Sequence, residues 1–183
     1  MHHTRQQHIE LFGRGPALLG DALRGCPKKM WMYRPTPDRW SIHEIILHLA
    51  DSEANCYVRS RQFIVEPGSD SVEYSASSWA SSLGYFHQST RDAIALITRL
   101  RRMTHHLLRF LPDSVWYHTM KLPKDGRMTL EQWIEKQASH IPHHAEQIRQ
   151  NLAEWSKTHK PRKPATRRLP GPSIKEPALT ALG

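Results

Sequence analysis

The chain has 183 residues, a length that fits one domain with its own hydrophobic core. Its 26 Lys and Arg against 17 Asp and Glu give a formal net charge of +9, which suggests nucleic acid or an anionic surface as a partner. An apolar fraction of 38% with six Trp excludes a wholly disordered chain, and thirteen His is an unusually high count.

The periodicity of apolar residues predicts long helices and no convincing strand, so we expect an all-α fold, a four-helix bundle. In the first helix, Pro16 either starts a second helical segment or kinks one helix. Ser41 with Glu44, and Thr129 with Gln132, form capping boxes that mark the starts of two helices. The predicted helices cover residues 4–26, 41–64, 83–111 and 129–155.

Two connections between these helices have unusual compositions. Residues 65–82 contain seven Ser and are longer than most bundle loops, so we expect them to form a lid or a pocket wall. Residues 112–128 contain the turn Lys124-Asp125-Gly126, which is consistent with a short hairpin.

The composition changes abruptly at Ser156. Residues 156–183 hold five Pro, seven basic residues and one acidic residue, which predicts a disordered basic tail after a domain at residues 1–155. The tail carries six of the nine net positive charges, so the predicted domain is only mildly basic. We therefore expect any contact with nucleic acid to be made through the tail.

The two cysteines, Cys26 and Cys56, show no metal-ligand spacing, so neither a thiolate zinc site nor a disulfide scaffold is indicated. Cys56 is expected in the core. The sequence has no apolar leader and no stretch that approaches a membrane span. We therefore expect a cytoplasmic protein without a membrane partner.

The last predicted helix carries a cluster of histidines. His140 and His144 are four residues apart, which places both imidazoles on one side, at the flank of the apolar stripe. By the same helix geometry, His143 points to solvent. Gln147 and Asn151 continue the edge that carries His140 and His144.

The second predicted helix has a matching polar edge. His48 lies on the flank of its apolar stripe, and Ser52, Asn55 and Arg59 follow along the same edge. Arg59 is either a solvated cation or a group that recognises an anion or carboxylate. If the two edges face each other, they line a pocket. Five further histidines are expected at the solvated surface: His43, His87, His105, His106 and His118.

This pattern is typical of a divalent metal site. Two imidazoles from one helix and a third from its neighbour provide three ligands and leave open positions for water or substrate. The alternative is that a His-x-x-x-His spacing arose by chance in a chain rich in histidine. Spacing alone leaves both interpretations open.

Two motifs give the chain a resemblance to a known family. The pattern W-S-x-x-E-x-x-x-H-x-x-D ends at Asp51, and the pattern H-x-x-H-H-x-x-Q-I begins at His140. Together with Glu73-Tyr74, the Leu-Pro-Asp element at residues 111–113 and the segment 126–133, they resemble the DinB/YfiT-like superfamily of metal-binding proteins. The resemblance covers roughly residues 5–155.

The resemblance implies a four-helix bundle with an unusual connection order and a divalent metal, Zn, Ni or Fe. Position by position, the metal ligands it implies are His48, His140 and His144. Asp51 matches the acidic position of the first motif, and we expect Asp51 and Gln147 to lie in the layer around the ligands.

Family members are described as metal-dependent hydrolases or as thiol S-transferases that use a low-molecular-weight thiol such as bacillithiol or mycothiol. The resemblance therefore implies an enzyme whose metal activates water or a thiol toward a small electrophilic substrate, with Asn55 and Arg59 binding that substrate. It also implies a homodimer. The alternative is a non-catalytic stress-response or nucleic-acid-associated protein that binds through its basic tail.

Overall fold

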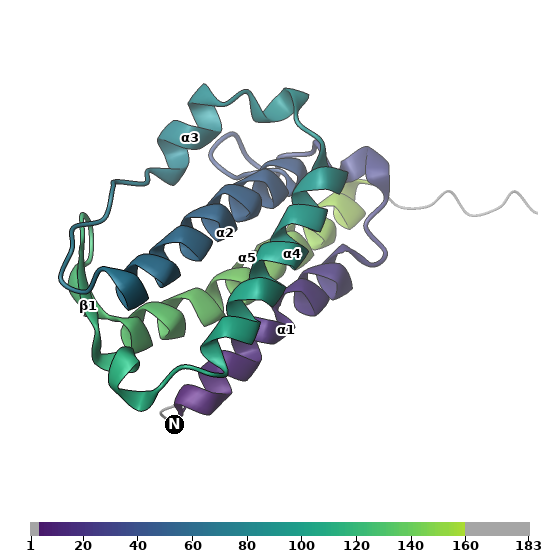
Figure 1. Cartoon of the computed structure of the whole chain (residues 1–183). Coiled ribbons are helices and arrows are strands. Elements are labelled where there is room, and N and C mark those ends of the chain that lie inside the picture. The colour runs from purple at the N-terminus through teal and green to yellow at the C-terminus, as the bar shows by residue number, and fades with distance from the viewer. Residues whose placement is uncertain (1–3, 160–183) are drawn as a thin grey trace, which may run out of the picture.

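The computed structural model describes residues 4–159, which form a bundle of four long helices (Figure 1). Helix α1 packs against α5 and α4, and α2 packs against the same two helices. The first two helices of the chain thus lie across the bundle from each other, and the predicted all-α four-helix bundle is confirmed. The four helices are α1 (Arg5–Leu23), α2 (Ile42–Val65), α4 (Thr90–Leu108) and α5 (Leu130–Thr158).

The capping boxes predicted from sequence are both present. Ser41 accepts a hydrogen bond from the backbone of Glu44, whose side chain in turn accepts one from the backbone of Ser41. Thr129 and Gln132 do the same at the start of α5. These boxes satisfy backbone donors that the first helical turn leaves without partners. Of the two alternatives for Pro16, the structure has one continuous helix that contains it.

Helix α4 begins later than predicted. Gly84 has a left-handed backbone conformation with φ of 58°, and the 3₁₀ helix η2 (Tyr85–His87) follows it, so the chain turns before α4 begins. The side chain of Ser89 then accepts a hydrogen bond from the backbone of Asp92 and caps α4. The expected start at residue 83 is therefore wrong.

Several short elements connect the long helices. Helix α3 (Ala76–Ser82) lies within the long Ser-rich connection, where no helix was predicted. The predicted hairpin is present as two antiparallel strands, β1 (Thr119–Leu122) and β2 (Gly126–Thr129), in which Thr119 faces Thr129. Two further 3₁₀ helices are η1 (Lys28–Met30) and η3 (Asp113–Tyr117).

The C-terminal helix runs past its predicted end. α5 continues to Thr158, so residues 156–158 are helical and the predicted tail does not begin at Ser156. The rest of the predicted tail, residues 160–183, lies outside the described residues.

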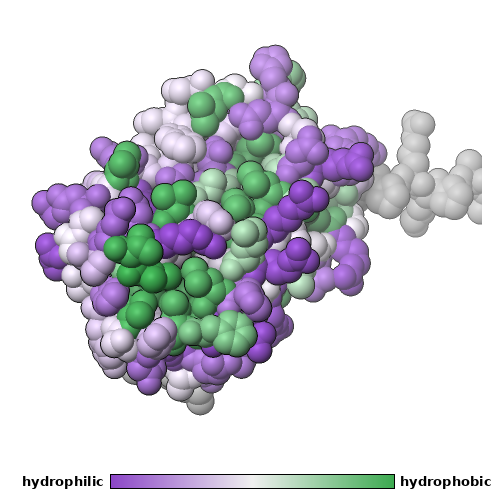
Figure 2. Space-filling model, viewed as in Figure 1, coloured by the Kyte–Doolittle hydropathy of each residue, from purple (hydrophilic) through white to green (hydrophobic). Residues whose placement is uncertain are grey.

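Hydrophobic side chains reach the surface on the face formed by α2 and α4 (Figure 2). The exposed apolar residues of these two helices include Val58, Val65, Leu96 and Met103. Apolar side chains thus occupy part of this face, which agrees with the small net charge of residues 1–155. Among the described residues, no helix combines the length and the apolar character that a membrane crossing requires.

Candidate metal centre

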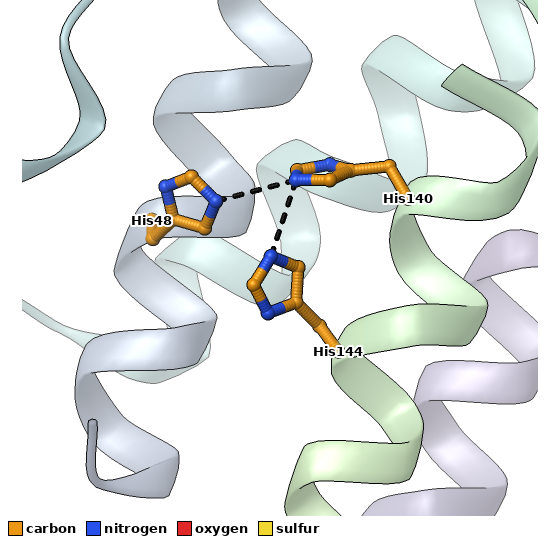
Figure 3. A group of neighbouring side chains, drawn as sticks. All are labelled: His48, His140 and His144. Carbon is orange, nitrogen blue, oxygen red and sulfur yellow. Dashed lines mark hydrogen bonds between the residues drawn. The ribbon is translucent and has the colours of Figure 1, made fainter. Parts of the chain in front are cut away.

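The structure brings His48, His140 and His144 together in the interior of the bundle (Figure 3). His48 comes from α2, and the other two histidines come from successive turns of α5. Because four residues make slightly more than one helical turn, His140 and His144 project from the same side of α5. The two polar edges of α2 and α5 therefore face each other at this level.

The Nε2 atoms of the three rings converge. His48 Nε2 lies 3.3 Å from His140 Nε2, which in turn lies 3.1 Å from His144 Nε2. Each residue offers one nitrogen to a group whose members lie within 4.8 Å of one another. Two neighbouring rings can share one hydrogen between their Nε2 atoms. Three nitrogens around a single space instead suit a metal ion, which accepts a lone pair from each of them.

The outer nitrogens of the same rings have partners of their own. His144 Nδ1 donates a hydrogen bond to Gln147 Oε1 at 2.8 Å, which leaves the lone pair of this imidazole on Nε2, facing the cluster. His48 Nδ1 lies 3.2 Å from Tyr74 Oη, and His140 Nδ1 lies 3.4 Å from Ser52 Oγ. A polar partner on the outer nitrogen is the usual arrangement around a histidine that binds a metal.

Burial keeps the three imidazoles neutral. Removal from water lowers the pKa of His48 to about 3, of His140 to about 2 and of His144 to about 4, and the proximity of the other histidine rings lowers each of the first two further. At neutral pH each ring therefore has a free lone pair, the form in which histidine binds a metal.

The donor set fits a divalent metal ion. Ligand distances of about 2.0–2.1 Å around a tetrahedral ion place two ligand nitrogens roughly 3.4 Å apart. The two shortest Nε2 separations, 3.1 and 3.3 Å, are close to that value. Three neutral imidazoles suit zinc, nickel and iron, and they leave at least one coordination position for another molecule.

Trp40 closes one side of the cluster. Its ring centroid lies 4.8 Å from that of His48, and its ring plane is within 13° of the His144 plane at a centroid distance of 6.5 Å. On this side a second pocket of about 210 Å³ is bordered by Trp40 and His144. Trp40 lies one residue before the capping residue Ser41, so the same local structure that begins α2 also places the indole.

A pocket of about 400 Å³ opens beside the cluster and is bordered by His48 and His140. Ser52, Asn55 and Arg59 line it along α2, as the polar edge predicted from sequence. Its size is within the range of pockets that hold small organic ligands. A molecule in this pocket would reach the space beside the three imidazoles.

Arg59 brings a positive charge to the pocket. It donates a hydrogen bond to the backbone oxygen of Val72 at 2.7 Å, and its guanidinium lies 5.6 Å from the ring centroid of Trp133. Burial lowers its pKa below the usual value. Within residues 4–159 no carboxylate lies at ion-pair distance from Arg59, so the guanidinium can pair with an acidic ligand.

Asp51 and Gln147, both expected around the ligands, have different roles in the structure. Gln147 contacts His144 directly, as described above. The Asp51 carboxylate instead accepts a hydrogen bond from Tyr85 Oη, and burial raises its pKa. Asp51 thus holds the connection between α3 and α4, and it is Tyr74 that contacts the outer nitrogen of His48.

Sequence reasoning missed Tyr74 as a neighbour of the histidines. The long connection was expected to form a pocket wall, and Tyr74 does line the pocket, but an irregular segment has no periodicity from which the direction of a side chain can be read. His43 was expected at the surface but is buried, and its Nε2 lies 2.7 Å from the backbone oxygen of Tyr85. Cys56 is buried as expected.

Two curated relatives are similar to the chain. Both carry the name "Putative metal-dependent hydrolase"; one is from Halalkalibacterium halodurans and the other from Oceanobacillus iheyensis. They are 29% identical over 113 residues and 30% identical over 109 residues, which are 62% and 60% of this chain. The matched segments cover 66% and 63% of the relatives, so the chain spans just under two thirds of their length.

Among solved structures, the fold is shared by YfiT from Bacillus subtilis. It is described as "YfiT from Bacillus subtilis is a probable metal-dependent hydrolase with an unusual four-helix bundle topology". The TM-score is 0.75 at 21% sequence identity, and the match covers 84% of this chain and 87% of that one. The model of the DinB superfamily matches residues 11–148, which is most of the chain. The chain therefore belongs to the DinB superfamily.

Proposed function

We propose that the protein is a metal-dependent enzyme that activates water, or a low-molecular-weight thiol, toward a small electrophilic substrate. The observation that carries the proposal is the convergence of three neutral imidazole nitrogens beside a pocket. The names of the two relatives and of the YfiT structure support the hydrolase form of this activity. The thiol form rests on the family resemblance.

His48, His140 and His144 would hold the metal through Nε2, with Gln147 fixing the ring of His144 and Tyr74 contacting the ring of His48. A divalent ion bound there supplies a Lewis acid, which lowers the pKa of water or of a thiol. The Trp40 ring would pack against the imidazole of His48 and help to hold its orientation.

Asn55 and Arg59 would orient the substrate along α2. The guanidinium of Arg59 would pair with an acidic group, and the side chain of Asn55 would offer hydrogen bonds beside it. We expect no protein thiol to act as the nucleophile, because burial raises the pKa of Cys26 and raises that of Cys56 to about 12.

Metal titration of the purified protein tests the site. We expect one divalent ion per chain in the parent protein. Substitution of any of the three histidines by alanine should weaken binding by more than about 100-fold, since loss of an outer partner alone costs 10–100-fold. The control is His106→Ala, which removes an exposed histidine of α4. A parent protein without stoichiometric metal would overturn the proposal.

Turnover experiments separate the two nucleophiles. An activated ester and an alkylating electrophile would be incubated with the metal-loaded protein in the presence and absence of a low-molecular-weight thiol. Metal-dependent turnover without thiol identifies a hydrolase, and strict thiol dependence identifies a transferase. Arg59→Gln should raise KM for acidic substrates and leave KM for neutral ones unchanged, whereas Arg149→Gln, at an exposed ion pair, should change neither.

A further inference from the structure

The connection between α2 and α4 covers the site with very little packing of its own. We define residues 66–89 as the covering segment; its helix α3 lies along the outside of α2 (Figure 1). From Val72 to Gly84 no side chain is buried. Because apolar burial is the main source of local stability, the position of this stretch depends on a few polar contacts.

Polar contacts with the described remainder of the protein hold the covering segment near its two ends and at Tyr74. Ser71 donates a backbone hydrogen bond to Lys121 at 2.9 Å, and Val72 accepts one from Arg59. Tyr85 Oη donates to Asp51. The contact at Tyr74 joins its Oη to His48 Nδ1 at 3.2 Å, and within residues 4–159 it is the polar contact that links the segment to the three clustered histidines.

The chemistry of imidazole makes the contact between Tyr74 and His48 sensitive to a metal. A metal on His48 Nε2 takes the lone pair of that atom, so the ring hydrogen must be on Nδ1. In that tautomer Nδ1 donates to Tyr74 Oη, which accepts. Without the metal either tautomer is available, and the contact with Tyr74 has no fixed direction.

The ring of Tyr74 is itself held in place. It lies within 11° of parallel to the imidazole of His48 at a centroid distance of 6.5 Å. Trp79 of α3 meets it edge-on with centroids 5.0 Å apart. Tyr74 thus connects a metal-ligating side chain on one side with the helix of the covering segment on the other.

We propose that Tyr74 is a positioning residue which orients His48 for the metal and links metal occupancy to the placement of the covering segment over the pocket. The inference rests on the proposed metal site. Because coupling between two equilibria is reciprocal, a metal that favours the Tyr74 contact orders the segment, and an ordered segment strengthens metal binding.

Tyr74→Phe tests the proposal, since it removes Oη and keeps the ring that packs on Trp79. The metal dissociation constant would be measured with Zn²⁺ by chelator competition, and amide hydrogen exchange of residues 72–84 would be followed with and without Zn²⁺. In the parent, zinc should slow exchange of this stretch. The variant should bind zinc about 10–100-fold more weakly and lose the zinc-dependent protection.

Tyr85→Phe is the matched control. It removes a hydroxyl from the same segment by the same chemical change, but its partner is Asp51 and not a histidine of the cluster. We expect the zinc-dependent protection of residues 72–84 to be retained and the zinc dissociation constant to stay within about threefold of the parent value, since no partner of a metal ligand is lost.

The failures are distinguishable. A parent that binds no stoichiometric zinc overturns both the proposed function and this inference. A parent that binds zinc beside a Tyr74→Phe variant with equal affinity and equal protection overturns the inference alone. If the variant does not fold, nuclear magnetic resonance of the zinc-loaded parent decides: a slowly exchanging Nδ1 hydrogen of His48 close to the Tyr74 ring supports the contact, and its absence overturns it.

Discussion

Arg101 and Glu53 form an ion pair in the interior of the bundle, with Nη2 3.1 Å from Oε1 and almost no exposure of either side chain. The guanidinium also donates to the backbone oxygen of Gln137 from both terminal nitrogens and lies 3.8 Å from the ring centroid of Phe12. Glu53 is on α2 and Gln137 is on α5, so Arg101 of α4 ties together the two helices that carry the clustered histidines.

Breaking this pair should destabilise the protein strongly. Glu53→Gln or Arg101→Met leaves one buried charge without compensation, and we expect a loss of about 3–5 kcal/mol in the free energy of unfolding, measured by urea denaturation. The double variant Glu53→Leu with Arg101→Met should recover part of that loss. The exposed pair of Lys157 and Glu154 provides the control, because Glu154→Gln should cost less than about 1 kcal/mol. Equal losses of unfolding free energy at the two ion pairs would contradict the prediction.

Two glycines of α1 should respond to alanine in opposite directions. A Cβ at Gly15 would lie 2.9 Å from Ile141 Cδ1 and 3.2 Å from Arg101 Nε, so Gly15→Ala should destabilise the fold by about 1–3 kcal/mol through overpacking. A Cβ at Gly20 meets open space, and Gly20→Ala should stabilise the helix by up to about 1 kcal/mol. Thermal unfolding of the two variants and the parent measures the difference.

The metal-free protein should lose stability as the pH falls below about 6.5. The clustered histidines have pKa values of about 2 to 4 in the folded protein, whereas an unfolded histidine titrates near about 6.5. At pH values between the folded and the unfolded pKa, the unfolded chain binds more protons than the folded protein does. Lowering the pH therefore favours unfolding. Each histidine contributes about 1.4 kcal/mol per pH unit within this window.

Urea denaturation at several pH values between 7 and 4.5 measures this slope. His140→Gln removes one titrating group. The slope of its unfolding free energy against pH should therefore be smaller than that of the parent by the contribution of about one proton. Asp51 and Glu53, whose pKa values burial raises, act in the opposite direction, but they are present in both proteins and cancel in the comparison. Identical slopes would show that His140 is not held neutral.

Trp40 should report metal loading by fluorescence. It contacts the rings of His48 and His144, whereas Trp155 stacks on His159 at the far end of α5. Cu²⁺ or Co²⁺ in the cluster should quench the emission of Trp40 by energy transfer. Trp40→Phe should remove most of the metal-dependent quenching, and Trp155→Phe should leave it unchanged; the reverse pattern would place the metal elsewhere.

Helical residues of the site could be predicted from the sequence because helix geometry converts a spacing directly into a direction. A separation of four residues sufficed to place His140 and His144 on one side of α5, and the polar edge of Ser52, Asn55 and Arg59 indeed lines the pocket. The start of α2 at Ser41 could be predicted for the same reason, since the capping box is a local interaction.

Contacts with the irregular segments could not be predicted in the same way. Tyr74 and Tyr85 reach α2 because the chain turns at positions such as Gly84, and tertiary contacts set those turns. Asp51 illustrates the consequence: it was expected in the layer around the ligands, but its partner, Tyr85, belongs to another element. The buried pair of Glu53 and Arg101 was missed because charged side chains are normally assigned to the surface.

Each imidazole of the cluster lies in helical phase with the capping residue of its helix where a capping box is present. His48 follows Ser41 by seven residues and His140 follows Thr129 by eleven, about two and three full turns, so each imidazole projects on the same side as the cap of its helix. One inserted or deleted residue within either spacer would rotate the imidazole by about 100° and carry it out of the cluster. Homologues that keep the site should therefore vary in length only outside these two spacers.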